Sequence, residues 1–291
     1  MTFNLTKQRF KFIYLMRVYN KYSASLFAMI ISFIRNKSLI YQMTKREVIG
    51  RYKGTFIGLG WSFFYPILML GVYTFVFTVV FKARWGSEGL EETSDFAVIL
   101  FVGLIIHSLF AEVINRAPGL IFSNANYVKK VVFPLDILPV VVMGAALFHM
   151  LISMVVLLCA ILLSKGIVEW TVLYVPVIIL PLILVILGCA WILASLGVYL
   201  RDVGQTIGVI TTAMLFLAPV FYPVSALPEK YQIYLFLNPL TFIIEQSRQV
   251  LIYGNSPDWN GMLVYSSISI FIAWIGYWWF QKTRKGFADV L

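Results

Sequence analysis

The sequence predicts an all-α integral membrane protein with six transmembrane helices, an N-terminal amphipathic interfacial helix and a re-entrant helical pair before the last span. Of its 291 residues, 60% are hydrophobic and only 12% are charged, whereas about 25% of the residues in a soluble domain are charged. The charged residues are also segregated, and a helix needs about 20 mainly apolar residues to cross a bilayer core. Asp, Glu, Lys and Arg are absent from 54–81, 96–111, 137–164, 170–200, 203–228 and 259–281.

The N-terminal segment is basic and contains one short apolar run. This run, 23–34, follows several Lys and Arg residues, and Arg35 and Lys37 close it without a small-residue cleavage site. It therefore lacks the pattern of a signal peptide. Because 12 residues are too few to span a bilayer, we expect this run to lie along the membrane surface.

An amphipathic interfacial helix is expected over 39–53, ahead of the first span. Residues three or four apart lie on one face of a helix, and the basic Arg46 and Lys53 fall opposite the less polar face. Such a helix lies in the plane of the membrane interface. The less polar face consists of Tyr41, Thr44, Val48 and Tyr52.

The transmembrane helices are predicted from the charge-free windows, and prolines within them mark where a helix is expected to bend or end. Pro66 lies early in the first span and is expected to kink it. Pro219 and Pro223 interrupt the fifth span near its end. The six spans are expected at about 61–82, 96–116, 138–164, 171–200, 205–223 and 261–281.

Two segments between spans carry their own expectations. The polar and basic segment 123–136 is predicted to be a short cytoplasmic helix or an ordered loop. The stretch 224–258 contains apolar runs that are too short for two crossings, so it is predicted to form a re-entrant pair of short helices turned by Asn238 and Pro239. Irregular backbone at membrane depth requires burial in protein or contact with a cavity.

The distribution of basic residues predicts the orientation. If both termini are cytoplasmic, 18 of the 23 Lys and Arg residues fall on the cytoplasmic side, as the positive-inside rule requires. The formal net charge of +10 is therefore interpreted as a sign of topology and of contact with membrane lipid. No nucleic-acid partner is expected.

Ionisable groups at membrane depth are few, which argues against an ion-coupled carrier. Glu112 and Arg116 are four residues apart and are expected to form a structural ion pair. His107 and His149 are expected to be isolated donors in helix packing. A carrier or flippase acting alone nevertheless remains an alternative.

The sequence also lacks the residues of an enzyme. It contains no Gly-Lys pair, and therefore no phosphate-binding loop for ATP. It shows no Ser-His-Asp set, paired carboxylates or metal cluster, and no cofactor is expected in this chain. Cys159 and Cys189 both lie in apolar windows and indicate no disulfide framework. If the protein moves a substrate uphill, a partner must supply the energy.

An ordered set of motifs resembles the ABC-2 type transporter permeases, in particular the polysaccharide exporters for O-antigen, capsule and teichoic acid. The resemblance covers 38–291 as one transmembrane domain and leaves 1–37 as a basic, interfacial extension. The motifs are 46–53 (Arg-Glu-Val-Ile-Gly-Arg-Tyr-Lys), 57–61 (Ile-Gly-Leu-Gly-Trp), Tyr65-Pro66, Phe133-Pro134-Leu135, Arg201-Asp202-Val203 and 237–241 (Leu-Asn-Pro-Leu-Thr).

The resemblance implies a homodimeric permease that works with two copies of a separate ATP-binding cassette subunit, which binds ATP and magnesium. The implied cargo is a polyprenyl-diphosphate-linked polysaccharide, foremost O-antigen, exported from the cytoplasm to the periplasm across a bacterial inner membrane. The helix 39–53 is then an interfacial gate helix, 123–136 holds the coupling helix, and 224–257 forms a periplasmic gate. An ABC-2 exporter of a capsule or teichoic acid polymer, a drug or a lipid is the alternative.

These roles assign expected site residues. Arginine binds phosphate bidentately, and aromatic faces stack on the C–H faces of sugars, although the same aromatic residues are common in lipid-facing helices. The residues expected to attract the diphosphate are Arg46, Arg51 and Lys53. The expected pore aromatics are Tyr65, Tyr73, Phe77, Phe81, Phe216, Phe221 and Tyr222. ATPase coupling is assigned by resemblance to Asn124, Asn126, Tyr127, Lys129 and Lys130, and the periplasmic gate to Pro223, Pro228, Asn238 and Pro239.

Overall fold

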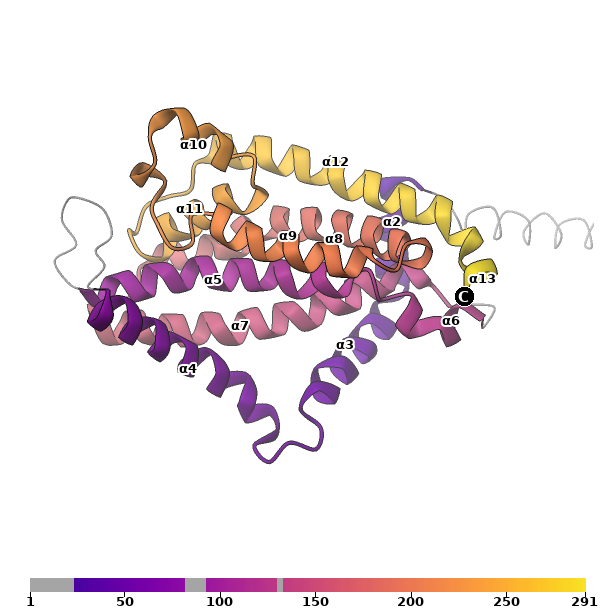
Figure 1. The fold of residues 1–291 in the computed structure, drawn as a ribbon, viewed down its shortest axis with the longest axis horizontal. Helices are drawn as coiled ribbons and strands as arrows, with labels where there is room; N and C mark the ends of the chain where they lie inside the picture. Colours follow the sequence, from indigo (N-terminus) through magenta and orange to yellow (C-terminus); the bar gives the residue numbers. More distant parts are fainter. Residues whose placement is uncertain (1–23, 82–92, 130–132) are drawn as a thin grey trace, which may run out of the picture.

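The computed structural model describes residues 24–81, 93–129 and 133–291, and these residues form helices joined by turns. Its long helices run side by side in one bundle (Figure 1). This arrangement confirms the predicted all-α, multi-span architecture. The long helices are α5 (Thr93–Arg116), α7 (Leu138–Lys165), α8 (Val175–Tyr199) and α12 (Trp259–Thr283).

Within the described ranges, five helical segments are long and apolar enough to cross a membrane. They correspond to the expected first, second, third, fourth and sixth spans. The segments are Gly58–Phe77, Phe96–Arg116, Leu135–Lys165, Trp170–Tyr199 and Trp259–Val290.

The expected fifth span is shorter than predicted. Its helix, α9 (Val203–Leu217), has 15 residues and is therefore about 22 Å long, less than the roughly 30 Å of a hydrocarbon core. The helix ends because Ala218, which precedes Pro219, adopts an extended conformation, as a residue before proline prefers. The chain continues through turns to the short 3-10 helix Val224–Ala226.

Helix α5 forms the centre of the bundle, whereas the first span lies at its edge. In the most apolar window of each segment, 83% of the residues of α5 are buried but only 11% of those of the first span. Helix α5 packs against α7 and α9, and also against α11 (Pro239–Leu251). The first span begins as α4 (Trp61–Thr74), with Pro66 buried inside it, and continues as the π-helix Phe75–Val80.

Helices α8 and α12 pack with their backbones in contact. A Cβ atom added to Gly188 or Gly276 would collide with the backbone of the facing helix. Glycine is required at these two positions because it alone permits so close an approach.

The N-terminal helix α2 (Leu26–Arg35) packs against the bundle with one face. Met29 is buried, and the ring of Phe33 stacks on that of Trp191 with centroids 5.9 Å apart. The Ser32 hydroxyl donates to the Asp136 carboxylate at 2.5 Å. The opposite face exposes apolar side chains that include Phe27, so the expected position of this run along a membrane surface stays a prediction.

Helix α3 (Lys37–Tyr52) corresponds to the expected interfacial helix and packs against α7. Val48 is buried and Thr44 and Tyr52 are partly buried, but Tyr41 is 68% exposed. Of the four residues expected to share one face, Tyr41 is therefore the one that the bundle leaves exposed. Met43, which is buried, contacts the bundle from another side of the helix.

Helices α3 and α4 form a hairpin that diverges from the bundle. Figure 1 shows the two helices as the sides of a V, with the turn between them farthest from α7. The turn contains Gly54 and Gly58 with φ of 86° and 57°, a conformation that glycine adopts without strain. Residues of this hairpin, of α5 and of α7 together line a cavity in the wedge between the hairpin and the bundle.

The two ends of the bundle carry different elements. At one end lie α10 (Glu229–Leu235) and the start of α11, turned at Asn238, whose side chain accepts a hydrogen bond from the amide of Leu240 at 3.0 Å. This pair of short helices confirms the expected helical pair before the last span. At the other end lie α6 (Ala125–Lys129) and α13 (Phe287–Val290), as Figure 1 shows.

Candidate functional site

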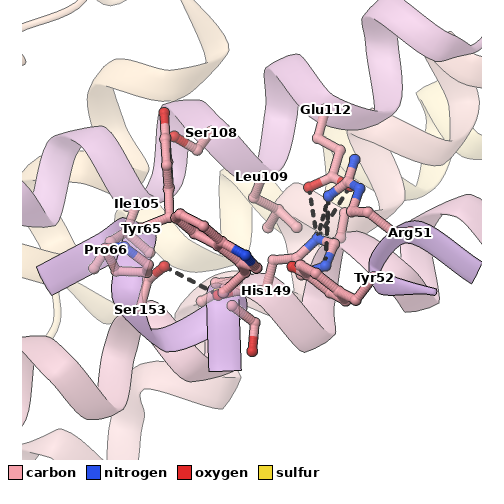
Figure 2. Close-up of a pocket in the computed structure, with 14 residues that line it drawn as sticks. Arg51, Tyr52, Tyr65, Pro66, Ile105, Ser108, Leu109, Glu112, His149 and Ser153 are labelled. Carbon is pink, nitrogen blue, oxygen red and sulfur yellow. Dashed lines mark hydrogen bonds and ion pairs between the residues drawn. The ribbon is translucent and has the colours of Figure 1, made fainter. Parts of the chain in front are cut away.

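The wedge between the α3–α4 hairpin and the bundle contains a cavity of about 390 Å³. Ligand pockets commonly occupy about 300 to 1,000 Å³. Four helices, α3, α4, α5 and α7, contribute its walls. Its aromatic and charged lining residues are Arg51, Tyr52, Trp61, Tyr65, Glu112 and His149 (Figure 2).

Three charged or ionisable side chains from three helices converge on one side of this cavity (Figure 2). Arg51 Nη2 of α3 lies 2.9 Å from Glu112 Oε1 of α5. His149 Nδ1 of α7 lies 3.1 Å from both carboxylate oxygens of Glu112. The Glu112 side chain is only 17% exposed, so these contacts compensate for the cost of removing its charge from water.

His149 contacts both of its charged neighbours. Arg51 Nη1 lies 2.8 Å from His149 Nδ1 and 3.4 Å from His149 Nε2, and Nδ1 also faces the Glu112 carboxylate. The imidazole therefore lies between the guanidinium and the carboxylate and connects α7 to both α3 and α5.

A second ion pair connects α3 to the end of α5. Arg116 Nη2 contacts Glu47 Oε1, and Arg116 Nη1 lies 4.0 Å from Glu112 Oε1. The expected pair of Glu112 and Arg116 is therefore present, but it is the longest of these contacts. The expectation that His149 is isolated is wrong, because residues far apart in the sequence surround it. His107 is confirmed as a packing group, with Nε2 3.0 Å from the Thr211 carbonyl of α9.

The three residues expected to attract phosphate lie along α3 and at its end. Arg46 donates to the Tyr127 hydroxyl of α6 at 3.1 Å, and this hydrogen bond raises the pKa of Arg46. The side chain of Arg51 is 44% exposed beside Glu112. Lys53 is exposed at the C-cap of α3. Burial raises the pKa of Tyr52, so its phenol remains a neutral hydrogen-bonding group.

The expected pore aromatics divide into a cluster and separate residues. Phe77 stacks on Phe221 at a centroid distance of 6.1 Å and lies 5.7 Å from Phe81, while Phe221 stacks on Phe216 at 5.6 Å. These four residues, named the aromatic cluster here, join the end of the first span to the end of α9.

Of the other three aromatic residues, Tyr65 and Tyr73 lie apart from that cluster, whereas Tyr222 adjoins it. Tyr65 is 64% exposed and lines the cavity, and Tyr73 packs partly buried against the core. Tyr222 donates to the Phe216 carbonyl at 2.9 Å. Whether any of these side chains faces a translocation path stays a prediction.

The residues expected to couple to an ATPase lie near α6. Asn124 donates to the Leu120 carbonyl at 2.9 Å, and the Tyr127 ring stacks on Phe133 at 4.4 Å. Asn126 is exposed, and Lys129 ends α6. Lys130 lies outside the described residues. The short helix confirms the expected secondary structure of this segment, while its coupling role stays a prediction.

The expected gate residues lie in the turns around α10 and α11. Pro223 precedes the 3-10 helix Val224–Ala226, and Pro228 is the N-cap of α10. Asn238 donates to the Met214 carbonyl of α9 at 3.4 Å, and the Pro239 carbonyl accepts from Tyr265 at 2.8 Å. The turn is therefore attached to both α9 and α12.

Arg248 is a buried residue that the sequence analysis did not single out. Its side chain is 1% exposed and lies 2.8 Å from Glu245. It also donates to the Ile99 carbonyl at 3.3 Å and to the Val220 carbonyl at 3.1 Å. The signal that could have indicated this ion pair is Glu245, three residues earlier on the same helix. Arg248 therefore connects α11 to α5 and to the turn after α9.

The fold and these contacts define a class of protein: a multi-span membrane protein with a largely apolar cavity that carries one charged cluster at the side of its bundle. A comparison with known families makes the class specific. The family described as ABC-2 type transporter matches residues 38–252. The chain belongs to this family, and the match begins at α3 and ends just after α11.

Similar proteins are found along most of the chain. An O-antigen export system permease protein, RfbA of Myxococcus xanthus, is 26% identical over 255 residues, which cover 87% of this chain and 95% of the relative. RfbA of Klebsiella pneumoniae is 25% identical, with the same two coverages. The polysialic acid transport protein KpsM of Escherichia coli is 23% identical over 78% of this chain and 87% of its own length.

Proposed function

We propose that the chain is the permease subunit of an ATP-binding cassette exporter that moves a lipid-linked polysaccharide, foremost O-antigen, across the bacterial inner membrane. The observation that carries the proposal is the cavity behind the α3–α4 hairpin, which combines an arginine with exposed aromatic faces. The names of the relatives support the cargo, because O-antigen and polysialic acid are both glycans.

The power source is assigned to a partner. The sequence contains no Gly-Lys pair and hence no phosphate-binding loop, so two separate ATP-binding subunits would supply the energy. Helix α6 would receive their movement. The hydrogen bond from Arg46 to Tyr127 would give that movement a direct route to α3, and the Arg116–Glu47 ion pair would pass it from α3 to the end of α5.

Two copies of the chain would enclose the path of the polymer. Helix α4 exposes a large apolar and aromatic surface, as a span does when it faces a second copy or lipid. The aromatic cluster joins this span to α9 and offers several weak stacking surfaces. Weak, repeated contacts suit a polymer that must slide, because tight binding at one position would halt it.

The lipid-linked diphosphate would approach the end of α3. Lys53 is exposed there, and Arg51 is partly exposed. Because Arg51 already contacts Glu112, a diphosphate that binds Arg51 must compete with that carboxylate. Substrate arrival would thereby loosen α3 from α5, and closure of the ATPase subunits would then open the path.

The orientation is proposed from the grouping of elements. Helices α6 and α13 lie at one end of the bundle (Figure 1), and the flanking basic residues assign that end to the cytoplasm. Helices α10 and α11 would then lie on the periplasmic side and form the gate. In this orientation both termini are cytoplasmic.

A second candidate is a carrier that acts alone. The contact between Glu112 and His149 is the observation that favours it, because proton-coupled carriers keep such groups within their spans. Arg51 weakens this candidate, since a guanidinium that neutralises Glu112 disfavours proton uptake by the carboxylate.

Three measurements test the proposal. Deletion of the gene should abolish surface glycan and cause lipid-linked polymer to accumulate inside the cell. An ATP-binding cassette subunit should co-purify with the permease. Vesicles that contain the permease alone should transport nothing under a proton gradient, and transport by the lone chain would instead establish the carrier.

The phosphate role has its own test. The double variant Arg46→Ala, Arg51→Ala should impair export but leave dimer assembly intact, as size-exclusion chromatography would measure. Unchanged surface polymer in this variant would contradict the proposed attraction of the diphosphate.

A further inference from the structure

We infer that the cavity between α3, α4, α5 and α7 is a binding subsite for the single sugar residue that adjoins the diphosphate of the lipid-linked glycan. The inference rests on the proposed function and adds to it a second recognition element. The protein would then bind the first sugar at a site of its own, distinct from the sites that contact the diphosphate and the rest of the polymer.

The position of the cavity is the first argument. Arg51 forms part of its wall, and Lys53 follows two residues later in the turn that closes the wedge. A diphosphate held at the end of α3 therefore places its attached sugar at the opening of the cavity. The long polymer extends away from the same point.

The chemistry of the walls is the second argument. Trp61 and Tyr65 of α4 present accessible aromatic surface, and an edge-to-face contact with Phe64 at 5.2 Å orients Trp61. Ile105 and Leu109 of α5, both almost fully buried, add apolar surface at the base of the cavity. A pyranose ring has apolar C–H faces, and such a slot accommodates them.

The polar groups in the cavity suit the rim of a sugar. The Ser108 hydroxyl is exposed on the cavity side of α5 and can both donate and accept. Glu112 offers carboxylate oxygens with several acceptor positions. Figure 2 shows the charged cluster on one side of the cavity and Tyr65, Ser108 and Ser153 on the other. Hydroxyl groups around a ring can therefore meet partners on both sides.

The charge of the cavity is the third argument, because it selects a neutral ligand. Before the diphosphate arrives, Glu112 and Arg51 neutralise each other at 2.9 Å; when the diphosphate takes Arg51, the carboxylate of Glu112 is left to accept from sugar hydroxyl groups. A phosphate inside the cavity would meet the Glu112 carboxylate, and a cation would meet Arg51. A neutral ring with many hydroxyl groups is repelled neither by the Glu112 carboxylate nor by the Arg51 guanidinium.

The size of the cavity limits the ligand to a small part of the polymer. A volume of about 390 Å³ lies near the lower end of the range for ligand pockets. It suits one or two sugar rings and excludes a longer stretch. The cavity is thus fitted to the start of the glycan, whereas the aromatic cluster lies elsewhere on the chain.

Two lipids that differ by one sugar provide the test. The permease, purified with its ATPase subunits in nanodiscs, is titrated with a fluorescent polyprenyl diphosphate. This probe is then displaced by unlabelled polyprenyl diphosphate, either bare or carrying one hexose. We expect the hexose-bearing lipid to bind the wild type at least about fivefold more tightly than the bare lipid, which corresponds to about 1 kcal/mol.

The variants assign this preference to the cavity. Tyr65→Ala and Ser108→Ala should each reduce the preference for the hexose-bearing lipid and leave the affinity for the bare lipid unchanged. Phe63→Ala is the matched control, because Phe63 is an exposed aromatic residue of α4 that does not line the cavity. It should retain the full preference.

The possible failures are distinguishable. If both lipids bind the wild type equally, or if Tyr65→Ala weakens both equally, the sugar subsite is refuted while the proposed export function stands. If neither lipid binds the wild type, the proposed function falls with the subsite. If phosphatidylglycerol displaces the hexose-bearing lipid as well as that lipid displaces itself, the cavity is a phospholipid site and the inference is overturned.

Discussion

Replacement of Arg248 by methionine should destabilise the protein more than replacement of an exposed lysine at the same end of the bundle. The guanidinium is 1% exposed and pairs with Glu245, whose side chain is 29% exposed. Arg248→Met removes this ion pair and leaves the carbonyls of Ile99 and Val220 without their donor. Breaking a buried ion pair costs about 3 to 5 kcal/mol, and partial hydration of Glu245 favours the lower end.

Thermal unfolding in detergent, followed by tryptophan fluorescence, measures this loss. A loss of about 3 kcal/mol should lower Tm by roughly 6 to 10 °C. Arg248→Lys keeps the charge, but an ammonium group cannot reproduce the three hydrogen bonds of the guanidinium to Glu245, Ile99 and Val220. Its Tm should therefore lie between that of the wild type and that of Arg248→Met. Lys230→Met is the control, because Lys230 is exposed on α10 and contacts only the Tyr231 ring face at 4.8 Å among its described interactions.

The result that refutes this reasoning is equally specific. If Arg248→Met unfolds within about 1 °C of the Lys230→Met control, a difference of less than about 0.5 kcal/mol, then Arg248 does not stabilise the junction of α11 with α5. An Arg248→Lys variant as unstable as Arg248→Met would show that hydrogen-bond direction, and not charge, accounts for the stabilisation.

Three further predictions concern the site. Tyr127→Phe removes the acceptor of Arg46 and should reduce export per ATP hydrolysed in reconstituted complexes, whereas unchanged coupling would exclude this contact from the route between α6 and α3. His149→Asn keeps a donor near the position of Nδ1 and should retain most export, while His149→Leu should lose it; equal activity of the two variants, measured as surface polymer, would show that this hydrogen bond is dispensable. Phe77→Ala with Phe221→Ala should alter polymer-stimulated ATPase activity more than either single change, and an additive result would argue against their direct stacking.

Most of the fold could be predicted from the sequence because a bilayer limits both the length and the charge content of the segments that cross it. Charged residues are excluded from the hydrocarbon core, so the charge-free windows at 137–164 and 170–200 coincide with α7 and with the segment that ends in α8. The short fifth helix shows the limit of this approach. Its charge-free window is long enough to cross a bilayer, but the helix ends at Leu217 because Ala218, which precedes Pro219, is extended. The absence of charged residues does not indicate where a helix ends.

The contacts of the site were harder to predict because they join distant parts of the chain. Arg51 and His149 are 98 positions apart, and His149 and Glu112 are 37 apart. Sequence spacing identifies neighbours only within one helix, which is why the pairing of Glu112 with Arg116 was anticipated and the cluster was not. Arg248 was missed for a related reason. A basic residue between two predicted spans is expected to face water, and only the structure shows that this one is buried.

The close contact between Gly188 and Gly276 has a consequence for how the protein can move. Because the backbones of α8 and α12 touch there, neither helix can slide or rotate against the other without a steric clash. A movement within the chain would meet less steric resistance at the hairpin of α3 and α4, which contains two positive-φ glycines and leads into a first span whose apolar window is only 11% buried. The α8–α12 contact and the hairpin thus differ in how much movement their packing permits.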